Sequence, residues 1–502
     1  KTGALPTGLA MTLDNSIVYS RPLSVSENFF RCRTASGNYR NFVVTATYNQ
    51  SLKKKLYVLV KALRKTILEY PILATTVKFD KTVNAFAYVP LKTINLSDIL
   101  FFEGDEKWLT NGVINENYMK YCNETQFKLY EENVLFKLIL VGDFHLSAIF
   151  EHTIGDGLVA NYFHEVLLKN LAECESIEDA AFETQFGPLV FENIKAEDEI
   201  FNFSKDKLYI KNSLPPPIDP FLEDIDLDYS FGDPHFQDKI IPEGFPSKWK
   251  GRFDTVDTHD ISFKLINFSK QETKIILSKC KEHKVGITSY IEVVHALTLQ
   301  PIFGDNSFTT HRTAMTLRRH YTPDLAEPPY KKILSDSEYK IFGTLAHMGF
   351  VQNFPPIKVF SWDLVKKVNL DLSKAVKNKR ALNQMKLWKD TGDLLDEKNM
   401  AFFDTQYNKP KADAVKISNL GFIELPEYAT KNDKKWVISD MVFSQDMAPY
   451  ASEFMLSVVS TPIGGMNFVL SYYDYSFEDG NWENFDEFVT KLHDNMLRYA
   501  SF

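Results

Sequence analysis

The stretch that decides how this chain is interpreted reads Ile149-Phe150-Glu151-His152-Thr153-Ile154-Gly155-Asp156-Gly157. An apolar run from Phe144 to Phe150 leads into it. After Asp156, apolar side chains recur at the spacing of an amphipathic helix. The pattern predicts a buried strand that ends at Glu151-His152, a short turn with two glycines, and a helix that begins near Asp156.

Three interpretations of this segment compete. Residues 155–160 have the GxGxxA form of a dinucleotide-binding turn, but no strand ending in an acid follows about 20 residues later, so we set this one aside. In the second, His152 is a general base and Asp156 orients the loop, while Gly155 and Gly157 keep side chains away from the imidazole. In the third, His152 is a core residue and Asp156 only caps the helix. The pattern alone leaves the second and third open.

Composition excludes several classes of protein. The 502 residues are 44% hydrophobic and 25% charged, which is typical of a soluble globular protein with two domains or one two-lobed fold. A net charge of -9 without long basic runs argues against a nucleic-acid partner. No run approaches the ~18 apolar residues of a membrane-spanning helix. The four cysteines form no CxxC pair, so neither zinc nor a disulfide framework is indicated. We expect no metal, and no GxSxG, GxxxxGK or HExxH motif occurs.

Periodicity predicts an α/β (α+β) organisation in two lobes. The first lobe, residues 1–205, is expected to hold the His152 segment, and a Pro-rich crossover follows at 206–250. The second lobe covers residues 251–502. In the first lobe we expect a strand near 42–48, a helix near 51–70 and hairpins at 73–90 and 134–150. In the second, we expect strands near 258–267, 309–319, 413–418, 435–443, 454–460 and 466–473, and helices near 269–284, 287–299, 362–389 and 485–499. For the last helix, docking on the core is favoured over a membrane surface.

The order of these features resembles the CoA-dependent acyltransferase superfamily, which includes chloramphenicol acetyltransferase, plant BAHD enzymes and peptide-synthetase condensation domains. Within it, the chain most resembles the fungal alcohol O-acetyltransferase family. The resemblance rests on Glu27-Asn28-Phe29-Phe30, Tyr39-Arg40-Asn41-Phe42, the His152-to-Gly157 site with its HxxxD pattern, Arg318-Arg319-His320 on an expected second-lobe strand, and Ser418-Asn419-Leu420-Gly421. The Asp-Phe-Gly-Trp-Gly string of the plant branch is missing, which excludes a close plant-type relationship.

The resemblance implies two chloramphenicol-acetyltransferase-like lobes, each a mixed sheet flanked by helices, with an active-site tunnel between them. His152 would deprotonate the acceptor, which would attack the thioester of acetyl-CoA directly, without an acyl-enzyme. Asp156 would pair with Arg318 and hold the loop. Ser418, Asn419 and Gly421 would contact CoA. Arg312 and Lys416 are further candidates for its phosphates, although exposed, solvated bases are the favoured interpretation of both.

The leading hypothesis is therefore an acetyltransferase that acts on the hydroxyl of an alcohol or another lipophilic acceptor. N-acetylation of a sphingoid base or a similar long-chain amino alcohol is the alternative on the same fold. A non-catalytic lipid-binding protein is the alternative of another class, because fold does not guarantee function. We expect a monomer in the cytoplasm, with peripheral association at the endoplasmic reticulum or lipid droplets as a further hypothesis.

Overall fold

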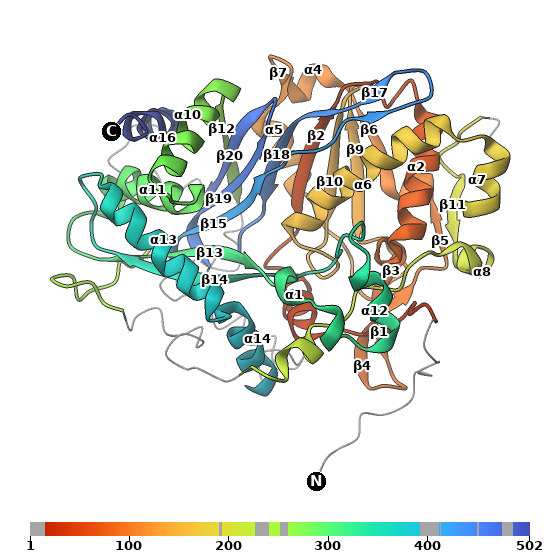
Figure 1. The fold of residues 1–502 in the computed structure, drawn as a ribbon, viewed down its shortest axis with the longest axis horizontal. Helices are drawn as coiled ribbons and strands as arrows, with labels where there is room; N and C mark the ends of the chain where they lie inside the picture. Colours follow the sequence, from red (N-terminus) through yellow and green to blue (C-terminus); the bar gives the residue numbers. More distant parts are fainter. Residues whose placement is uncertain are drawn as a thin grey trace, which may run out of the picture.

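The computed structural model describes residues 16–189, 193–225, 240–251, 260–391, 411, 413–448, 451–473 and 485–502. Two large mixed sheets lie next to each other, and helices cover the outer face of each (Figure 1). The predicted mixed α/β class is confirmed. The expected strand at 42–48 and the expected hairpins at 73–90 and 134–150 are all present.

The first sheet has the strand order β18-β2-β10-β9-β6. Its neighbours are antiparallel except for β6, which runs parallel to β9. Gly142 allows the tight turn between β9 and β10 because it adopts a φ of 59°. Helices α2 and α6 pack against each other, and α6 packs on β2 and β10. The bounds are β18 Ile438–Gln445, β2 Phe42–Tyr48, β10 His145–Phe150, β9 Phe136–Val141, β6 Leu100–Glu103, α2 Leu56–Glu69 and α6 Gly157–Ser176.

Smaller elements surround this sheet. Helix α1 (Val25–Ala35) begins with a capping box between Ser24 and Glu27. A three-stranded sheet has the order β1-β4-β3, and two-stranded ribbons pair β5 with β11, β7 with β8 and β16 with β17. Their bounds are β1 Arg21–Pro22, β3 Thr75–Asp80, β4 Ala85–Pro90, β5 Thr93–Asn95, β7 Leu109–Thr110, β8 Val113–Ile114, β11 Glu199–Asn202, β16 Tyr428–Ala429 and β17 Lys435–Trp436. The short helices are α3 Leu96–Ile99, α4 Asp105–Trp108, α5 Glu116–Asn123, α7 Asp179–Phe186 and α8 Phe203–Asp206.

The second sheet has the order β12-β20-β19-β15-β13-β14, in which β15 is parallel to both β13 and β19. Helices α10, α11 and α16 pack together on its outer side, at the left of Figure 1. The bounds are β12 Ile261–Phe268, β13 Thr309–Thr316, β14 Ala346–Phe354, β15 Asp413–Phe422, β19 Ser452–Thr461, β20 Gly465–Tyr473, α10 Lys270–Glu282, α11 Ile287–Phe303, α12 Pro328–Ser335 and α16 Phe485–Tyr499. Strand β14 had no counterpart in the sequence analysis.

The last part of the chain joins both sheets. Strand β18 pairs with β2 of the first sheet, with Phe443 opposite Val44. The chain then enters β19 of the second sheet. Trp436, Met441 and Phe443 are buried in the same core as Phe42. A segment from the second half of the sequence therefore completes the first sheet, and the two lobes are interleaved along the chain.

Two predicted elements end at other places than expected. The helix near 362–389 is two helices, α13 (Trp362–Lys377) and α14 (Arg380–Thr391). They break at Lys379, whose φ of 51° is incompatible with a continuous helix. The strand near 309–319 ends at Thr316. Arg318–His320 form a 3-10 turn, η5, so the prediction that Arg318 lies on a strand was wrong.

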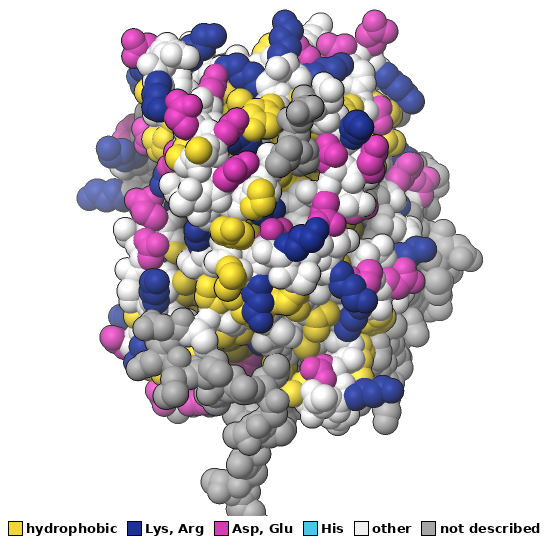
Figure 2. Space-filling view, turned by 90° about the vertical axis from the view of Figure 1, so that its right-hand side faces the viewer, with side chains coloured by type: hydrophobic (Ala, Val, Ile, Leu, Met, Phe, Trp, Pro, Cys, Tyr) yellow, Lys and Arg dark blue, Asp and Glu magenta, His cyan; other side chains and the backbone are white. Residues whose placement is uncertain are grey.

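The final helix docks on the core, as favoured from the sequence. Phe488, Leu492 and Met496 of α16 are buried with residues of α11 in the second core. Within the described residues, no helix is long and apolar enough to cross a membrane. On the face shown in Figure 2, the side of the first lobe away from α16, acidic and basic side chains are interspersed around hydrophobic ones that gather near the middle. Mixed charge of this kind creates no single-sign field.

The crossover predicted at 206–250 is described in part, because residues 226–239 lie outside the described ranges. Ile218, Phe221 and Leu222, in and beside the 3-10 turn Asp219–Leu222, are buried in the core of the second lobe. The crossover is thus packed against the fold at this point. All four cysteines are buried and free.

Candidate active site

His152 follows directly after β10, where three aromatic rings surround its imidazole. The ring of Phe30, from α1, stacks on it with centroids 3.9 Å apart. Tyr39 and Phe42 present their edges at 5.6 and 5.1 Å. Nδ1 lies 3.0 Å from the Thr344 hydroxyl oxygen. The ring is therefore held on its faces by packing and on one nitrogen by a hydrogen bond.

The surroundings of His152 favour the uncharged imidazole. Burial lowers its pKa well below the ordinary value, and the nearby positive charge of Arg33 lowers it further. A hydrogen bond from the ring to the main chain of His152 itself acts in the opposite direction. The neutral ring is the form that can accept a proton.

Asp156 is fully buried and receives hydrogen bonds from both halves of the chain. The Arg318 guanidinium donates to both carboxylate oxygens, at 2.9 Å each. The backbone N–H of Leu345 donates at 2.7 Å. The backbone N–H groups of Leu158 and Val159 complete the set at 3.1 and 3.3 Å. Asp156 is thus the N-cap of α6 and also the partner of an arginine. From the sequence these two roles were alternatives, and the structure combines them.

Arg318 also holds the loop that precedes β14. Its Nε donates to the Ile341 carbonyl at 3.0 Å, and Nη2 donates to the Gly343 carbonyl at 2.9 Å. The next residue, Thr344, is the one whose hydroxyl meets His152. The Asp156–Arg318 pair therefore fixes the loop that presents Thr344 to the imidazole.

The two glycines of the motif are required by close packing against other side chains, and not by the imidazole as expected from the sequence. A Cβ at Gly155 would lie 2.8 Å from the Val159 side chain. A Cβ at Gly157 would lie 2.9 Å from Phe443 and 3.0 Å from Leu420. These contacts bring β18 and the end of β15 against the His152 loop.

Ser418, Asn419 and Gly421 lie at the carboxyl end of β15. The Asn419 amide donates to the Thr288 hydroxyl at the start of α11, at 3.1 Å, and its carbonyl oxygen accepts from the backbone N–H of Gly421 at 2.8 Å. Gly421 has a φ of 98°, which only glycine adopts readily. Leu420, between them, contacts Gly157 as described. The structure therefore places this stretch beside the His152 loop.

This geometry was compared with known proteins. The model of the alcohol acetyltransferase family matches residues 24–496. The chain belongs to this family. A relative in Saccharomyces cerevisiae, named N-acetyltransferase SLI1, is 21% identical over 486 residues, which cover 90% of this chain and 94% of the relative.

Solved structures agree with the alcohol acetyltransferase assignment at the level of the fold. TRI3 trichothecene 15-O-acetyltransferase from Fusarium sporotrichioides superposes with a TM-score of 0.59 at 12% identity, covering 96% of this chain and 95% of that one. The condensation domain of the polyketide synthase MokA superposes with a TM-score of 0.57 at 12% identity, covering 97% and 98%. The predicted resemblance and the two-lobed fold are confirmed, and family membership supports an acyltransferase enzyme over a non-catalytic binding protein.

Two candidate phosphate contacts of this acetyltransferase are not the exposed bases favoured from the sequence. Arg312 is 8% exposed, and its Nε lies 3.1 Å from an Asp413 oxygen. The Lys416 side chain is 20% exposed, and its Nζ lies 3.7 Å from the other Asp413 oxygen. Burial, with repulsion from Arg312 and Arg33, lowers the pKa of Lys416 to about 8 although Asp413 opposes this. The interpretation as solvated surface bases was wrong because β13 and β15 lie inside the second sheet.

Sequence reasoning missed several residues around the imidazole. Phe30 and Tyr39 were quoted only as part of the family resemblance, and Thr344 was not singled out. The capping box that Ser24 and Glu27 form could have predicted that Phe30 lies on a helix. Glu151 is also buried, and its carboxylate accepts hydrogen bonds from Thr34 and from the Thr153 N–H. Among the described residues, no group of three or more His, Cys, Asp or Glu side chains could hold a metal ion.

Proposed function

We propose that this chain transfers the acetyl group of acetyl-CoA to the hydroxyl of a lipophilic alcohol, with His152 as the general base. The observation that carries the proposal is the hydrogen bond between the His152 imidazole and the Thr344 hydroxyl. Nδ1 is engaged by Thr344, so Nε2 is the nitrogen available to the acceptor.

In the proposed reaction, Nε2 takes the proton from the acceptor hydroxyl as its oxygen attacks the thioester carbonyl. The carbon–oxygen bond forms, and the carbon–sulfur bond then breaks. The imidazolium returns the proton to the departing thiolate, so the products are an acetate ester and free CoA. The lowered pKa of His152 keeps the ring neutral at the start of this cycle.

Asp156 and Arg318 act as positioning residues in this proposal. Their ion pair holds the loops on which His152 and Thr344 lie. We assign Ser418, Asn419 and Gly421 to the wall that receives the pantetheine arm and thioester of acetyl-CoA. Their support is the contact of Leu420 with Gly157, which puts the end of β15 beside the His152 loop.

N-acetylation of a long-chain amino alcohol, such as a sphingoid base, is the second candidate. It is favoured by the relative that is named an N-acetyltransferase. The same imidazole can remove the proton of an attacking amine, so the site chemistry does not separate the two acceptors.

The experiment compares wild type with His152→Ala and with His493→Ala, which removes a histidine of α16 far from the loop. Free thiol release from acetyl-CoA is measured with ethanol, isoamyl alcohol and phytosphingosine, and mass spectrometry identifies ester or amide products. We expect His152→Ala to lower the rate about 10²–10⁴-fold, while His493→Ala remains near wild type. A His152→Ala protein with undiminished transfer would refute the proposed mechanism.

A further inference from the structure

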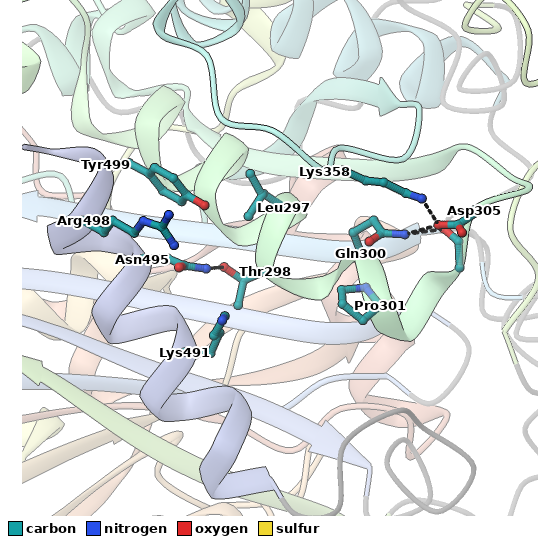
Figure 3. A pocket seen from close by; sticks show the side chains of 11 residues that line it. Leu297, Thr298, Gln300, Pro301, Asp305, Lys358, Lys491, Asn495, Arg498 and Tyr499 are labelled. Carbon is teal, nitrogen blue, oxygen red and sulfur yellow. Dashed lines mark hydrogen bonds and ion pairs between the residues drawn. The ribbon is translucent and has the colours of Figure 1, made fainter. Parts of the chain in front are cut away.

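A hollow lies on the outer side of the second lobe, between α11 and α16. It has a volume of about 550 Å³ and is open to solvent. Figure 3 shows its side chains converging from both helices and from the segment before α13. The residues that line it are Leu297, Thr298, Gln300, Pro301, Gly304, Asp305, Lys358, Lys491, Asn495, Arg498 and Tyr499.

This cavity is separate from the His152 site. Thr288, near the start of α11, contacts Asn419 at the end of β15. The cavity begins at Leu297, in the last part of the same helix. A rise of 1.5 Å per residue puts Thr298 roughly 15 Å further along the helix axis than Thr288. The cavity therefore opens at the opposite end of α11.

The cavity carries more positive than negative charge. Its one carboxylate, Asp305, is paired with Lys358 at 3.0 Å and accepts from the Gln300 amide. Within the described residues, no carboxylate lies within 4.0 Å of Lys491 or Arg498. Two cations from α16 thus face this space without a counterion among those residues.

Lys491 and Arg498 lie on one face of α16, and packing fixes the orientation of this helix. Lys491, Asn495 and Arg498 follow one another at spacings of four and three, which places them on one face of α16. Asn495, between them, is only 3% exposed, and its amide donates to the Thr298 hydroxyl of α11 at 3.0 Å. The other face of α16 is buried in the core through Phe488, Leu492 and Met496. The register of Lys491 and Arg498 toward the cavity is therefore fixed.

A structural role at the helix end explains only part of this arrangement. Arg498 lies in the last turn of α16, where a cation interacts favourably with the unpaired carbonyl groups. Lys491 lies near the middle of the helix, where that interaction has faded. Lys491 is exposed to solvent and lines the cavity beside Arg498.

We propose that this cavity binds a phosphate ester, held by Arg498 and Lys491. A guanidinium donates two parallel hydrogen bonds to phosphate oxygens, and an ammonium adds a point charge. The volume lies in the range of small-molecule sites, about 300–1,000 Å³, and is far larger than one free phosphate needs. Leu297 and Pro301 provide apolar surface for the remainder of the ligand. The phosphate can belong to a soluble small molecule or to a phospholipid headgroup.

The test uses the full-length chain and inorganic pyrophosphate as the probe, with binding measured by titration calorimetry at low and high salt. We expect Lys491→Gln/Arg498→Gln to weaken binding at least about tenfold, and added salt to weaken wild-type binding. Lys270→Gln/Lys274→Gln, on exposed positions of the neighbouring α10, changes the net charge equally and should bind as wild type. Equal binding by wild type and the α16 double variant, or no binding by folded wild type, would overturn the proposal.

The two sources of the phosphate are then separated. Wild type and the α16 double variant are each sedimented with phosphatidylcholine vesicles that do or do not contain phosphatidic acid. The ligand is a lipid headgroup if wild type sediments only with the vesicles that contain phosphatidic acid and the double variant stays in the supernatant. Pyrophosphate binding without vesicle binding identifies a soluble ligand. If the double variant also raises KM for acetyl-CoA, the soluble ligand is the phosphorylated end of the co-substrate.

Discussion

Arg318 and Asp156 form a buried ion pair through two hydrogen bonds of 2.9 Å, between residues 162 positions apart in the chain. The pair joins the N-terminus of α6 in the first lobe to the 3-10 turn η5 in the second. Because Arg318 also binds the carbonyls of Ile341 and Gly343, the pair determines where Thr344 meets His152.

We predict strong coupling between Asp156 and Arg318. Arg318→Met leaves a buried carboxylate without its cation, which costs about 3–5 kcal/mol of stability. The double variant Asp156→Asn/Arg318→Met should lose much less than the sum of the two single changes, because no uncompensated charge remains. Urea unfolding of the four proteins measures this. Strictly additive losses would contradict the assigned pair.

Acetyl transfer by the same four proteins gives a separate measurement. All three variants should be slow, including the double variant that regains stability, because neither asparagine nor methionine holds the loop of Thr344 as the ion pair does. Recovery of wild-type turnover in the double variant would show that the pair contributes only to stability.

Thr344 is predicted to fix the orientation and protonation of His152. Thr344→Val keeps the shape but removes the hydroxyl, and we expect kcat/KM to fall about tenfold, the equivalent of one hydrogen bond of about 1.4 kcal/mol. Since the hydroxyl accepts from Nδ1–H in the proposed mechanism, its loss disfavours the imidazolium and lowers the pKa of His152 further. The acid limb of the kcat/KM profile should then move to lower pH.

Thr344→Ser is the matched control because it restores the hydroxyl without the methyl group. It should return most of the rate and the wild-type pH profile. A serine variant as impaired as the valine variant would assign Thr344 a packing role instead.

Glu292 is predicted to make stability depend on pH. It is fully buried in α11, its carboxyl accepts from the Thr313 hydroxyl, and burial raises its pKa to about 8. The raised value means that the folded state prefers the protonated form. This contribution is complete below the ordinary Glu pKa near 4.5 and is lost as the pH rises toward 8.

Glu292→Gln removes this ionisation, so the variant should gain stability relative to wild type between pH 5 and pH 8. Urea midpoints at both pH values measure the difference. Glu282→Gln, at the end of α10 on the surface, is the control and should show no such trend. The same pH dependence in Glu292→Gln and wild type would mean that Glu292 ionises normally in the folded protein.

Several parts of the fold could be predicted from local pattern. The alternation at Phe42–Tyr48 predicted a strand, and the apolar runs on both sides of Gly142 predicted a hairpin. The helix near 362–389 was not interrupted in the prediction, because its apolar periodicity continues across the break while Lys379 adopts a positive φ that no sequence signal announces. The pairing of β18 with β2 could not be predicted either, since a strand pattern does not identify the strand with which it pairs.

For the site, the sequence by itself determined the local chemistry: an imidazole after a strand, two small residues beside it, and an aspartate at the start of a helix. The sequence also showed the family resemblance, which implied that Asp156 pairs with Arg318. The tertiary structure alone decided that Thr344 meets Nδ1, that Phe30 covers the ring, and that Arg312 and Lys416 lie inside a sheet. These contacts join residues far apart in the chain, so they depend on how sheets and helices pack, and no local periodicity encodes that.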